Sequence, residues 1–499
     1  MSKLRLMNGV VPIAYGLMSS LVMASSASAG DWPMYRHDPA RSAVTDEKLV
    51  LPLRQSWVYK CAQPPAPAWP DSFKLVNRLD FDYAPHPVIA EGIVFFGSSA
   101  DDTVRALDEK TGQEKWHFIT GGPVRFAPQI VKSRIYFASD DGHFYCLDTV
   151  TGKLIWKFRA APADERLAGQ HRMISRWPVR TGILVVDGVV YGVAGMWSAE
   201  GIFLYALDAD TGRVLWCTDG GGTPQGPLLS GGDVLIIPNG NSGPTPVNRR
   251  TGKQIQWSKG GQPGAGGTWL TIDGNDRLYS YAFHRSGVLM IQPYVLTNGL
   301  TGRCWGADVV PQLSILSKLY RTQIHAKGKV SAIVHNGKPY VRQAYGIAMS
   351  GNTLFLGDDG GVKAGNSLSP NADALWHAPV DGEARELAVA NGCLYVSTSK
   401  GIIYCFETDQ GGQSSTHSDK LSVNSHQSPV EGRTLVTDHR SPITVALRSA
   451  GMDRGFALVL GDYDARLSRT LAEQTKLRIV TVLPDAAATQ ALRARLLAE

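Results

Sequence analysis

The sequence predicts an all-β protein: a β-propeller of about seven four-stranded antiparallel blades, with eight as the alternative, followed by a short α/β segment. Two observations support this prediction. A hairpin motif recurs along the chain with constant internal spacing, which is typical of a repeat architecture. The 499 residues also contain 53 glycines, a content that favours a turn-rich β protein over a helical one.

The hairpin motif reads Ala (or Cys)-Leu-Asp-x-x-Thr-Gly-x-x-x-Trp. Its Asp can accept hydrogen bonds from the turn amides, its Gly supplies a positive φ, and its Trp lies on the returning strand. Three copies keep this spacing without change, at residues 106–116, 146–156 and 206–216. Looser copies contain Asn248 with Trp257, Gly302 with Trp305, and Trp376.

A second strand pair precedes each motif and is joined by a tight polar turn, such as Asp140-Asp141-Gly142. Each unit should therefore hold four short strands in roughly 40 residues, the size of a propeller blade. Asp140 and Asp141, like Asp358 and Asp359, are interpreted as residues of such turns.

One tryptophan, Trp57, stands outside the repeat order. Residues 53–59 resemble the last strand of a blade without its first three, whereas residues 385–407 resemble a blade without its last strand. Joining the two segments would close the ring and remove exposed sheet edges. Counting this composite blade gives about seven; the alternative of eight stays open because residues 306–340 are hard to place.

The repeated motif resembles the pyrroloquinoline-quinone (PQQ)-like propeller family. Residues 31–36, 177–180 and 195–197 resemble one large exported branch of it. The resemblance covers residues 31 to about 407 and implies that each repeated indole packs between neighbouring blades. The expected blade-docking residues are Trp57, Trp116, Trp156, Trp216, Trp257, Trp305 and Trp376.

The first 29 residues are interpreted as a signal peptide. Lys3 and Arg5 are followed by an uncharged stretch that ends in Ala27-Ser28-Ala29, so cleavage is expected after Ala29. The propeller would then occupy residues 30–407 of a periplasmic or secreted monomer without a membrane span. No cysteine stands at the cleavage site for lipid attachment.

The formal net charge is +6, but Lys and Arg are scattered, so a nucleic-acid partner is not expected. The six cysteines form no CxxC pair, and no metal site is predicted from them. Cys146 and Cys405 occupy matching places in two repeats. They are interpreted as buried apolar side chains, and a disulfide stays open as the alternative.

Quinoprotein alcohol dehydrogenases of the resembled superfamily hold PQQ on the propeller axis, beside calcium and a catalytic aspartate. This sequence has neither their adjacent cysteine pair nor a CxxCH haem motif. No catalytic residue is predicted. The primary hypothesis is an exported non-catalytic scaffold that binds a protein or a small molecule without a cofactor; the alternative is a PQQ- and calcium-dependent oxidoreductase.

A polar loop before an apolar strand is the candidate ligand-binding segment. Such loops on a rigid scaffold often bind ligands, here an anionic or peptide ligand at the axial opening. The alternative is a solvated loop that covers a blade. The loop contains His171, Arg172, Arg176, Trp177 and Arg180, with Arg166 before them.

The C-terminal composition differs from that of the repeats. Residues 408–442 are interpreted as a linker and residues 443–499 as a partial β-α-β-α unit. This unit resembles the opening of a class I S-adenosylmethionine-dependent methyltransferase, in which Gly461, Asp462 and Asp464 would lie in the cofactor loop. Later glycines of that loop are replaced by Tyr463 and Ala465. A third hypothesis is therefore the N-terminal part of a propeller–methyltransferase fusion.

Overall fold

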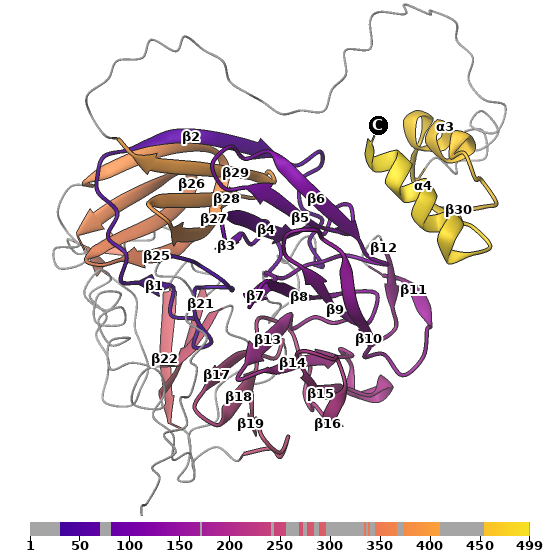
Figure 1. The fold of residues 1–499 in the computed structure, drawn as a ribbon, viewed down its shortest axis with the longest axis horizontal. Helices are drawn as coiled ribbons and strands as arrows, with labels where there is room; N and C mark the ends of the chain where they lie inside the picture. Colours follow the sequence, from indigo (N-terminus) through magenta and orange to yellow (C-terminus); the bar gives the residue numbers. More distant parts are fainter. Residues whose placement is uncertain are drawn as a thin grey trace, which may run out of the picture.

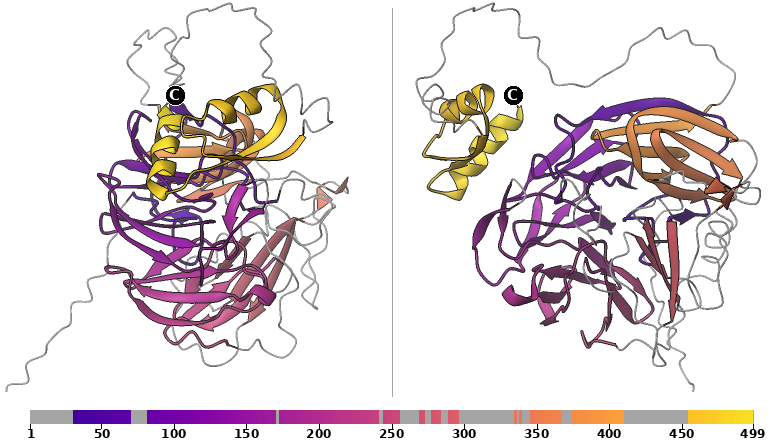
Figure 2. Two further views of the ribbon diagram at one scale, coloured as in Figure 1. Left: turned by 90° about the vertical axis from the view of Figure 1, so that its right-hand side faces the viewer. Right: turned by 180° about the vertical axis from the view of Figure 1, so that it is seen from behind.

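The computed structural model describes residues 30–69, 81–169, 172–240, 244–255, 269–272, 277–283, 289–295, 334–335, 338–339, 345–366, 374–409 and 454–498. Small antiparallel sheets stand around a common centre, with their first strands innermost, and form a β-propeller (Figure 1). The C-terminal unit lies beside the ring in Figure 1 and in the right-hand view of Figure 2.

Three sheets have four strands in sequence order. Their bounds are β3 (Val88–Ala90), β4 (Ile93–Gly97), β5 (Thr103–Asp108) and β6 (Glu114–Ile119); β7 (Gln129–Val131), β8 (Arg134–Ser139), β9 (His143–Asp148) and β10 (Leu154–Arg159); and β13 (Ile183–Val186), β14 (Val189–Ala194), β15 (Phe203–Asp208) and β16 (Val214–Asp219).

The remaining small sheets have two or three described strands. They are β17 (Leu229–Gly231), β18 (Val234–Ile237) and β19 (Thr245–Asn248); β20 (Trp269–Ile272), β21 (Arg277–Phe283) and β22 (Leu289–Val295); and the hairpins β11 (Arg166–Gly169)–β12 (Arg172–Ser175) and β23 (Val334–His335)–β24 (Lys338–Pro339). A 3-10 helix, η2, spans Ser198–Glu200.

The first and last segments of the ring meet in one seven-stranded sheet. In this sheet β2 pairs antiparallel with β29, and Trp57 lies opposite Cys405. The segments that the sequence analysis joins therefore lie side by side. The sheet contains β1 (Val44–Thr45), β25 (Ile347–Ser350), β26 (Thr353–Asn366), β27 (Trp376–Ala390), β28 (Cys393–Thr398), β29 (Ile402–Thr408) and β2 (Leu53–Lys60).

Strand β26 corrects one interpretation. Asp358 and Asp359 lie within this strand and not in a turn between strands. The register shifts between Asp359 and Gly361, and Gly360 has a φ of +77°. A β-bulge at this glycine therefore lets the strand continue through the acidic pair.

Repeated tryptophans join neighbouring sheets. Each donates its indole N–H to a backbone oxygen near the hairpin turn of the next sheet: Trp57 to Glu109 at 2.9 Å, Trp116 to Thr149 at 3.0 Å and Trp156 to Ala209 at 3.0 Å. Trp376 of β27 donates its indole N–H to the oxygen of Leu53 in β2, within the seven-stranded sheet, at 2.8 Å. Trp216 packs on Gly252, whereas Trp257 and Trp305 lie outside the described residues.

The hairpin turns have the predicted chemistry. The Oδ1 atom of Asp148 accepts from the Thr151 amide at 2.8 Å and from its hydroxyl at 2.7 Å. Asn248 accepts from the same two groups of Thr251 at 3.1 and 3.2 Å. An Asn therefore serves in the looser copy because only an acceptor oxygen is needed.

The N-terminal segment, residues 31–45, crosses the centre of the ring and is called the strap. Trp32 forms a bridge with Ile89, and Pro33 accepts from the Ile130 amide at 2.8 Å. Further along, the oxygens of Pro39 and Ala43 accept from the Ser230 and Met349 amides, each at 2.8 Å. The strap thus bonds the innermost strands of four different sheets.

The C-terminal unit consists of β30 (Arg454–Leu460), α3 (Arg466–Gln474), β31 (Lys476–Val482) and α4 (Ala486–Ala498), with β30 and β31 parallel. Ala465, Leu483 and Leu492 form its buried core, whereas Leu458 and Leu460 are exposed. No helix in the described part of the chain is long and apolar enough to span a membrane.

Candidate functional site

Charged and polar side chains gather where loops enter the innermost strands. Asp82 precedes β3, Arg125 precedes β7, Arg180 precedes β13 and Gln225 precedes β17, and all four are buried. Because these strands stand around the centre, their entry loops converge at one axial face.

Two arginines and two aspartates form a buried ion network at this face. Arg125 Nη1 lies 2.5 Å from Asp82 Oδ2, and Arg125 Nε lies 2.6 Å from Asp140 Oδ2. Arg180 Nε donates to both oxygens of Asp140, at 2.9 and 3.1 Å. The two positive and two negative charges compensate each other, as burial requires. Asp140 does lie in a turn, but its side chain links two sheets.

Trp69 covers the network. Its Nε1 donates to Gln225 Oε1 at 2.9 Å, and the Arg180 guanidinium lies 5.7 Å from its ring centroid. Trp69 packs in a small apolar cluster with Ala68, Phe81, Phe126 and Met196. The axial face is therefore closed on this side by a side chain of the protein itself.

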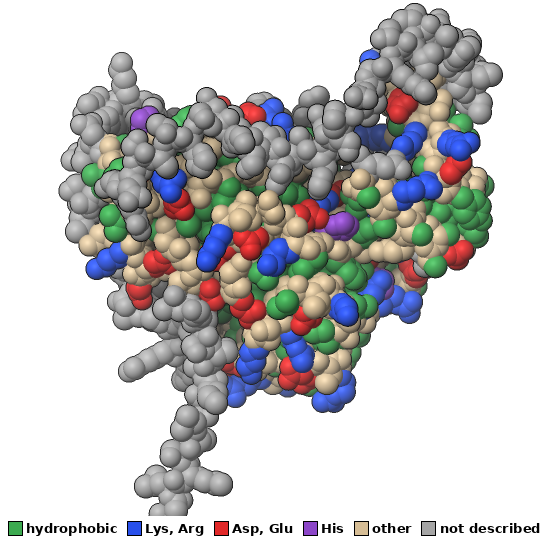
Figure 3. Space-filling model, turned by 45° about the horizontal axis from the view of Figure 1, so that its top comes forward, with side chains coloured by type: hydrophobic (Ala, Val, Ile, Leu, Met, Phe, Trp, Pro, Cys, Tyr) green, Lys and Arg blue, Asp and Glu red, His purple; other side chains and the backbone are tan. Residues whose placement is uncertain are grey.

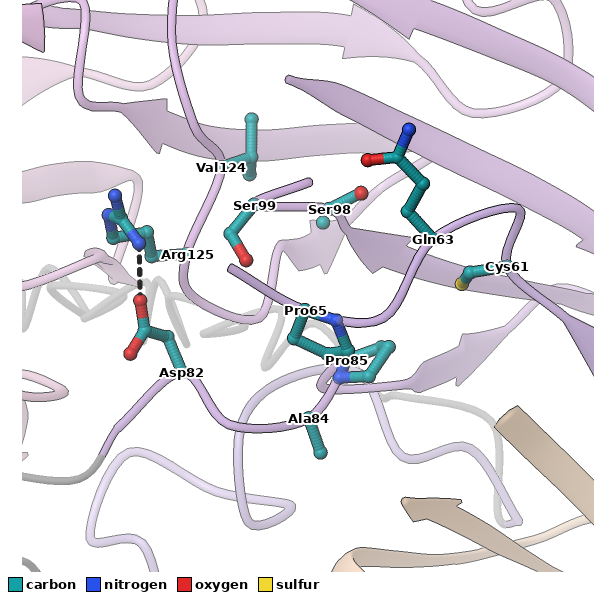
Figure 4. A pocket seen from close by; sticks show the side chains of 11 residues that line it. Cys61, Gln63, Pro65, Asp82, Ala84, Pro85, Ser98, Ser99, Val124 and Arg125 are labelled. Atoms are coloured by element: carbon teal, nitrogen blue, oxygen red, sulfur yellow. Dashed lines mark hydrogen bonds and ion pairs between the residues drawn. The ribbon is translucent and has the colours of Figure 1, made fainter. Parts of the chain in front are cut away.

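A small cavity of about 10 Å³, roughly the space that one water molecule needs, lies beside the network. Figure 4 shows Arg125 pointing toward Asp82, with Ser98 and Ser99 on a neighbouring loop. The Nη2 atom of Arg125 is buried and has no hydrogen-bond partner among the described residues. The lining residues are Cys61, Gln63, Pro65, Asp82, Ala84, Pro85, Gly97, Ser98, Ser99, Val124 and Arg125.

Burial determines the protonation states in the cavity. It raises the pKa of the Cys61 thiol to about 12, so Cys61 is not a thiolate nucleophile at neutral pH. Burial also raises the pKa of Asp82, against the opposing effect of Arg125. The cavity thus offers hydrogen-bond donors without an activated nucleophile beside a base.

The axial carboxylates do not fit a calcium ion. Calcium takes six to eight oxygen ligands, whereas Asp82 and Asp140 are each bound to a guanidinium group. A dication there would lie beside two fixed positive charges. Within the described ranges, no three His, Cys, Asp or Glu side chains gather as a metal site.

The described arginines of the predicted ligand loop bind neighbouring groups of the protein. Arg172 donates to the Ala100 oxygen at 2.6 Å and pairs with Asp102. Arg176 Nη1 lies 3.0 Å from a Glu165 oxygen, and its guanidinium lies 5.3 Å from the ring centroid of Trp177. Trp177 is buried.

Of that loop, only Arg180 belongs to the axial network, and His171 lies outside the described residues. Asp82, Arg125 and Trp69 are not among the site residues predicted from the sequence. A usable signal was the dipeptide Ala84-Pro85, which recurs as Ala127-Pro128 two residues after Arg125. Aligning these dipeptides would have placed Asp82 and Arg125 at matching positions.

The loop of residues 461–465, for which the sequence suggests a cofactor, caps a helix. Gly461 has a φ of +70°. Asp462 Oδ2 accepts from the Ser468 amide at 2.7 Å, and Asp464 Oδ1 accepts from the Arg466 amide at 3.2 Å. Both carboxylates therefore bind the start of α3, whose free amides favour them.

Acidic and basic side chains are interspersed on the face drawn in Figure 3, with no single-sign stripe on that face. A basic stripe is the electrostatic feature of nucleic-acid-binding surfaces. Lys and Arg, which are scattered along the sequence, are therefore also scattered over this face of the molecule.

Comparisons with known proteins agree with the fold. The family model described as outer membrane protein assembly factor BamB matches residues 100–260. A 1-butanol dehydrogenase (quinone) of Thauera butanivorans is 25% identical over 253 residues, which are 47% of this chain and 36% of the relative. A tetrathionate hydrolase of Acidithiobacillus ferrooxidans is 27% identical over 185 residues, which are 34% of this chain and 33% of the relative.

Among solved structures, the quinohemoprotein alcohol dehydrogenase of Comamonas testosteroni has a TM-score of 0.51 at 14% identity, covering 78% of this chain and 83% of that structure's chain. This similarity concerns the fold. The chain spans about a third of the length of the curated relatives it matches.

Proposed function

Because the chain contains a PQQ-like β-propeller, we propose that it is an exported, non-catalytic binding protein that takes a small carboxylate ligand at its axial face. The observation that supports this proposal is the buried Nη2 atom of Arg125, which has no partner among the described residues, in a residue that is among those lining a cavity. A buried donor without an acceptor costs about 1–3 kcal/mol, and a ligand oxygen would remove that cost.

The choice of a carboxylate follows from the donors. A guanidinium group offers a planar pair of N–H groups that match carboxylate oxygens, and the hydroxyls of Ser98 and Ser99 border the same cavity. Because Asp82 and Asp140 already compensate two arginines, the network tolerates little extra charge. Because the cavity has room for about one water molecule, the expected ligand is a monocarboxylate that places a single oxygen there.

Export is part of the proposal. It is supported by the signal-peptide pattern of residues 1–29 and by the match to a family described as an outer membrane assembly factor. The same match supports a protein partner as the second kind of ligand.

Calorimetric titration of the full chain with acetate, with acetamide as the neutral analogue, tests the carboxylate site. We expect saturable binding of acetate only, weakened at least tenfold in Arg125→Lys, which keeps the charge but loses Nη2. Ser99→Ala, which removes a lining hydroxyl, should weaken binding less. Arg134→Gln, at a half-buried outer position bonded to Asp210, should bind as the parent does. Equal heats for acetate and acetamide would contradict the proposal.

The second candidate is a quinone-dependent oxidoreductase, which the similarity to a 1-butanol dehydrogenase (quinone) favours. The carboxylate–guanidinium pairs at the axis argue against calcium binding there. Adding PQQ and calcium to the purified protein and following quinone absorbance and dye reduction with 1-butanol distinguishes the two. Turnover would replace the binding hypothesis with this one.

A further inference from the structure

One hairpin turn, residues 98–103 between β4 and β5, contacts three separate parts of the molecule. Ser98 and Ser99 border the Arg125 cavity. The Ala100 oxygen and Asp102 bind Arg172 of the predicted ligand loop. Asp102 also binds Arg493, which lies on α4 of the C-terminal unit. The turn therefore connects the cavity with a segment almost at the end of the chain.

Arg493 makes the principal contact of the C-terminal unit with the ring. Its Nη2 donates to Asp102 Oδ2 at 2.8 Å and to the Asp101 oxygen at 3.4 Å, and its Nη1 donates to the Thr120 oxygen. Gln490, one turn earlier, donates to the Ile119 oxygen at 3.4 Å. In Figure 1 the unit accordingly lies beside β6 and β12.

Both charges of this contact are largely withdrawn from water. The Asp102 side chain is 16% exposed and that of Arg493 is 23% exposed. Burial raises the pKa of Asp102, although Arg172 and Arg493 counteract this. Losing Arg493 would leave Asp102 with one guanidinium partner and an unsatisfied oxygen.

The turn also reaches the cavity through short bonds of its own. The Ser98 amide donates to the Thr103 oxygen at 2.8 Å, and the Ser98 oxygen accepts from the Val124 amide at 3.2 Å. The Ser99 hydroxyl accepts from the Ala66 amide at 3.0 Å. A shift of Asp102 would therefore move the two serines relative to Arg125.

We propose that the C-terminal unit, residues 454–498, docks reversibly on the 98–103 turn through Arg493 and thereby holds the cavity in its binding geometry. The proposal rests on the carboxylate site proposed above. The contacts are polar and few, as in interfaces that open and close. The covalent connection keeps the unit at a high effective concentration near the turn.

The test uses the full chain with Arg493→Glu, which places a carboxylate against Asp102, and with Arg493→Lys, which keeps the charge. Arg466→Glu is the matched control: it makes the same charge change on α3, where Arg466 is 88% exposed and pairs with Asp464. Small-angle X-ray scattering measures docking as the radius of gyration, and circular dichroism verifies folding. Calorimetric titration measures the affinity of the cavity for acetate.

We expect a larger radius of gyration and at least threefold weaker acetate binding in Arg493→Glu only. An unchanged radius in folded Arg493→Glu would overturn the docking, and undocking with acetate affinity within twofold of the parent would overturn the coupling. If the parent chain does not bind acetate, the carboxylate site is wrong, and scattering still decides whether Arg493 docks the unit.

Discussion

The indole of Trp116 lies directly against the α-carbon of Gly152, so that a Cβ on Gly152 would stand 2.7 Å from Cδ2 of Trp116. The same arrangement joins Trp156 to Gly212, where the corresponding distance is 2.8 Å. Two features therefore favour glycine at each of these hairpin turns: the positive φ, and the close approach of the indole from the preceding sheet.

Gly152→Ala should destabilise the ring more than the backbone alone explains. Gly188 has a similar φ, +74° against +66°, but no atom within 4 Å of a Cβ at its position. Gly188→Ala should therefore cost only about 1 kcal/mol of unfolding free energy, the backbone cost. Gly152→Ala should cost about 3 kcal/mol, because the indole must also move. Urea unfolding measures both, and equal losses would argue against the indole contact.

Asp148→Asn should alter the acid sensitivity of one hairpin turn. The Thr151 hydroxyl bond lowers the pKa of Asp148. A carboxylate with a lowered folded-state pKa stabilises the protein above its unfolded pKa of about 3.9, and this contribution is lost as the pH falls through the folded-state value. The variant should therefore lose less stability than the parent on acidification.

Urea midpoints of the parent and Asp148→Asn at neutral and acidic pH measure this difference. Asn248 serves the same role in another turn, so little change is expected at neutral pH. A variant that follows the parent curve at every pH would show that the Thr151 bond contributes no pH dependence.

Glu386→Gln should remove a contribution of Glu386 that lowers stability toward neutral pH. Glu386 Oε1 lies 3.6 Å from His86 Nε2, and its side chain is 17% exposed. Burial raises the pKa of Glu386 to about 7 and lowers that of His86 to about 3. The folded state then binds the Glu386 proton more tightly than the unfolded state, so this contribution to stability falls as the pH rises from the unfolded pKa to about 7.

The Glu386 contribution amounts to about 3 kcal/mol. His86 acts in the opposite direction, because its lowered pKa makes stability rise with pH between about 3 and its unfolded value of about 6.5. Unfolding free energies should therefore change little with pH in the parent and rise toward neutral pH in Glu386→Gln. Glu407→Gln, which loses an exposed pair with Arg54, should follow the parent. A Glu386→Gln profile equal to that of the parent would assign no pH-dependent contribution to Glu386.

Trp69→Ala should destabilise the axial face. The substitution removes a buried indole and its bond to Gln225, and a loss of about 3 kcal/mol in unfolding free energy is expected. Trp197, which is 40% exposed, provides the control, and Trp197→Ala should change stability by about 0.5 kcal/mol or less. If the two losses measured by urea unfolding were equal, Trp69 would not be a structural part of the centre.

The hairpins could be predicted because their chemistry is local. Asp108, Thr111 and Gly112 bond within one turn, and the spacing to Trp116 repeats. The joining of residues 53–59 to 385–407 followed from an incomplete repeat at each end. The α/β segment was readable for a similar reason, because its strands and helices alternate along the chain.

Only part of the axial network could be read from the sequence: Asp82 and Arg125 each stand two residues before an Ala-Pro dipeptide, whereas Asp140 and Arg180 share no such spacing. Asp140 was interpreted as a turn residue, since nothing nearby in sequence indicates that Arg125 and Arg180 approach it. The strap has no repeating pattern either. Its hydrogen bonds join backbone groups to distant strands, and backbone groups are the same whatever the side chain, so the sequence does not reveal them.

The junction between β2 and β29 has a consequence for the folding pathway. Trp376 bonds Leu53 across 323 sequence positions, and such distant pairing forms slowly because a long loop must close first. Cys61, Gln63 and Pro65, which follow β2, border the Arg125 cavity. The nascent chain therefore cannot present a finished cavity until its last propeller strand has been synthesised, so a truncation product lacking β29 would have no complete pocket.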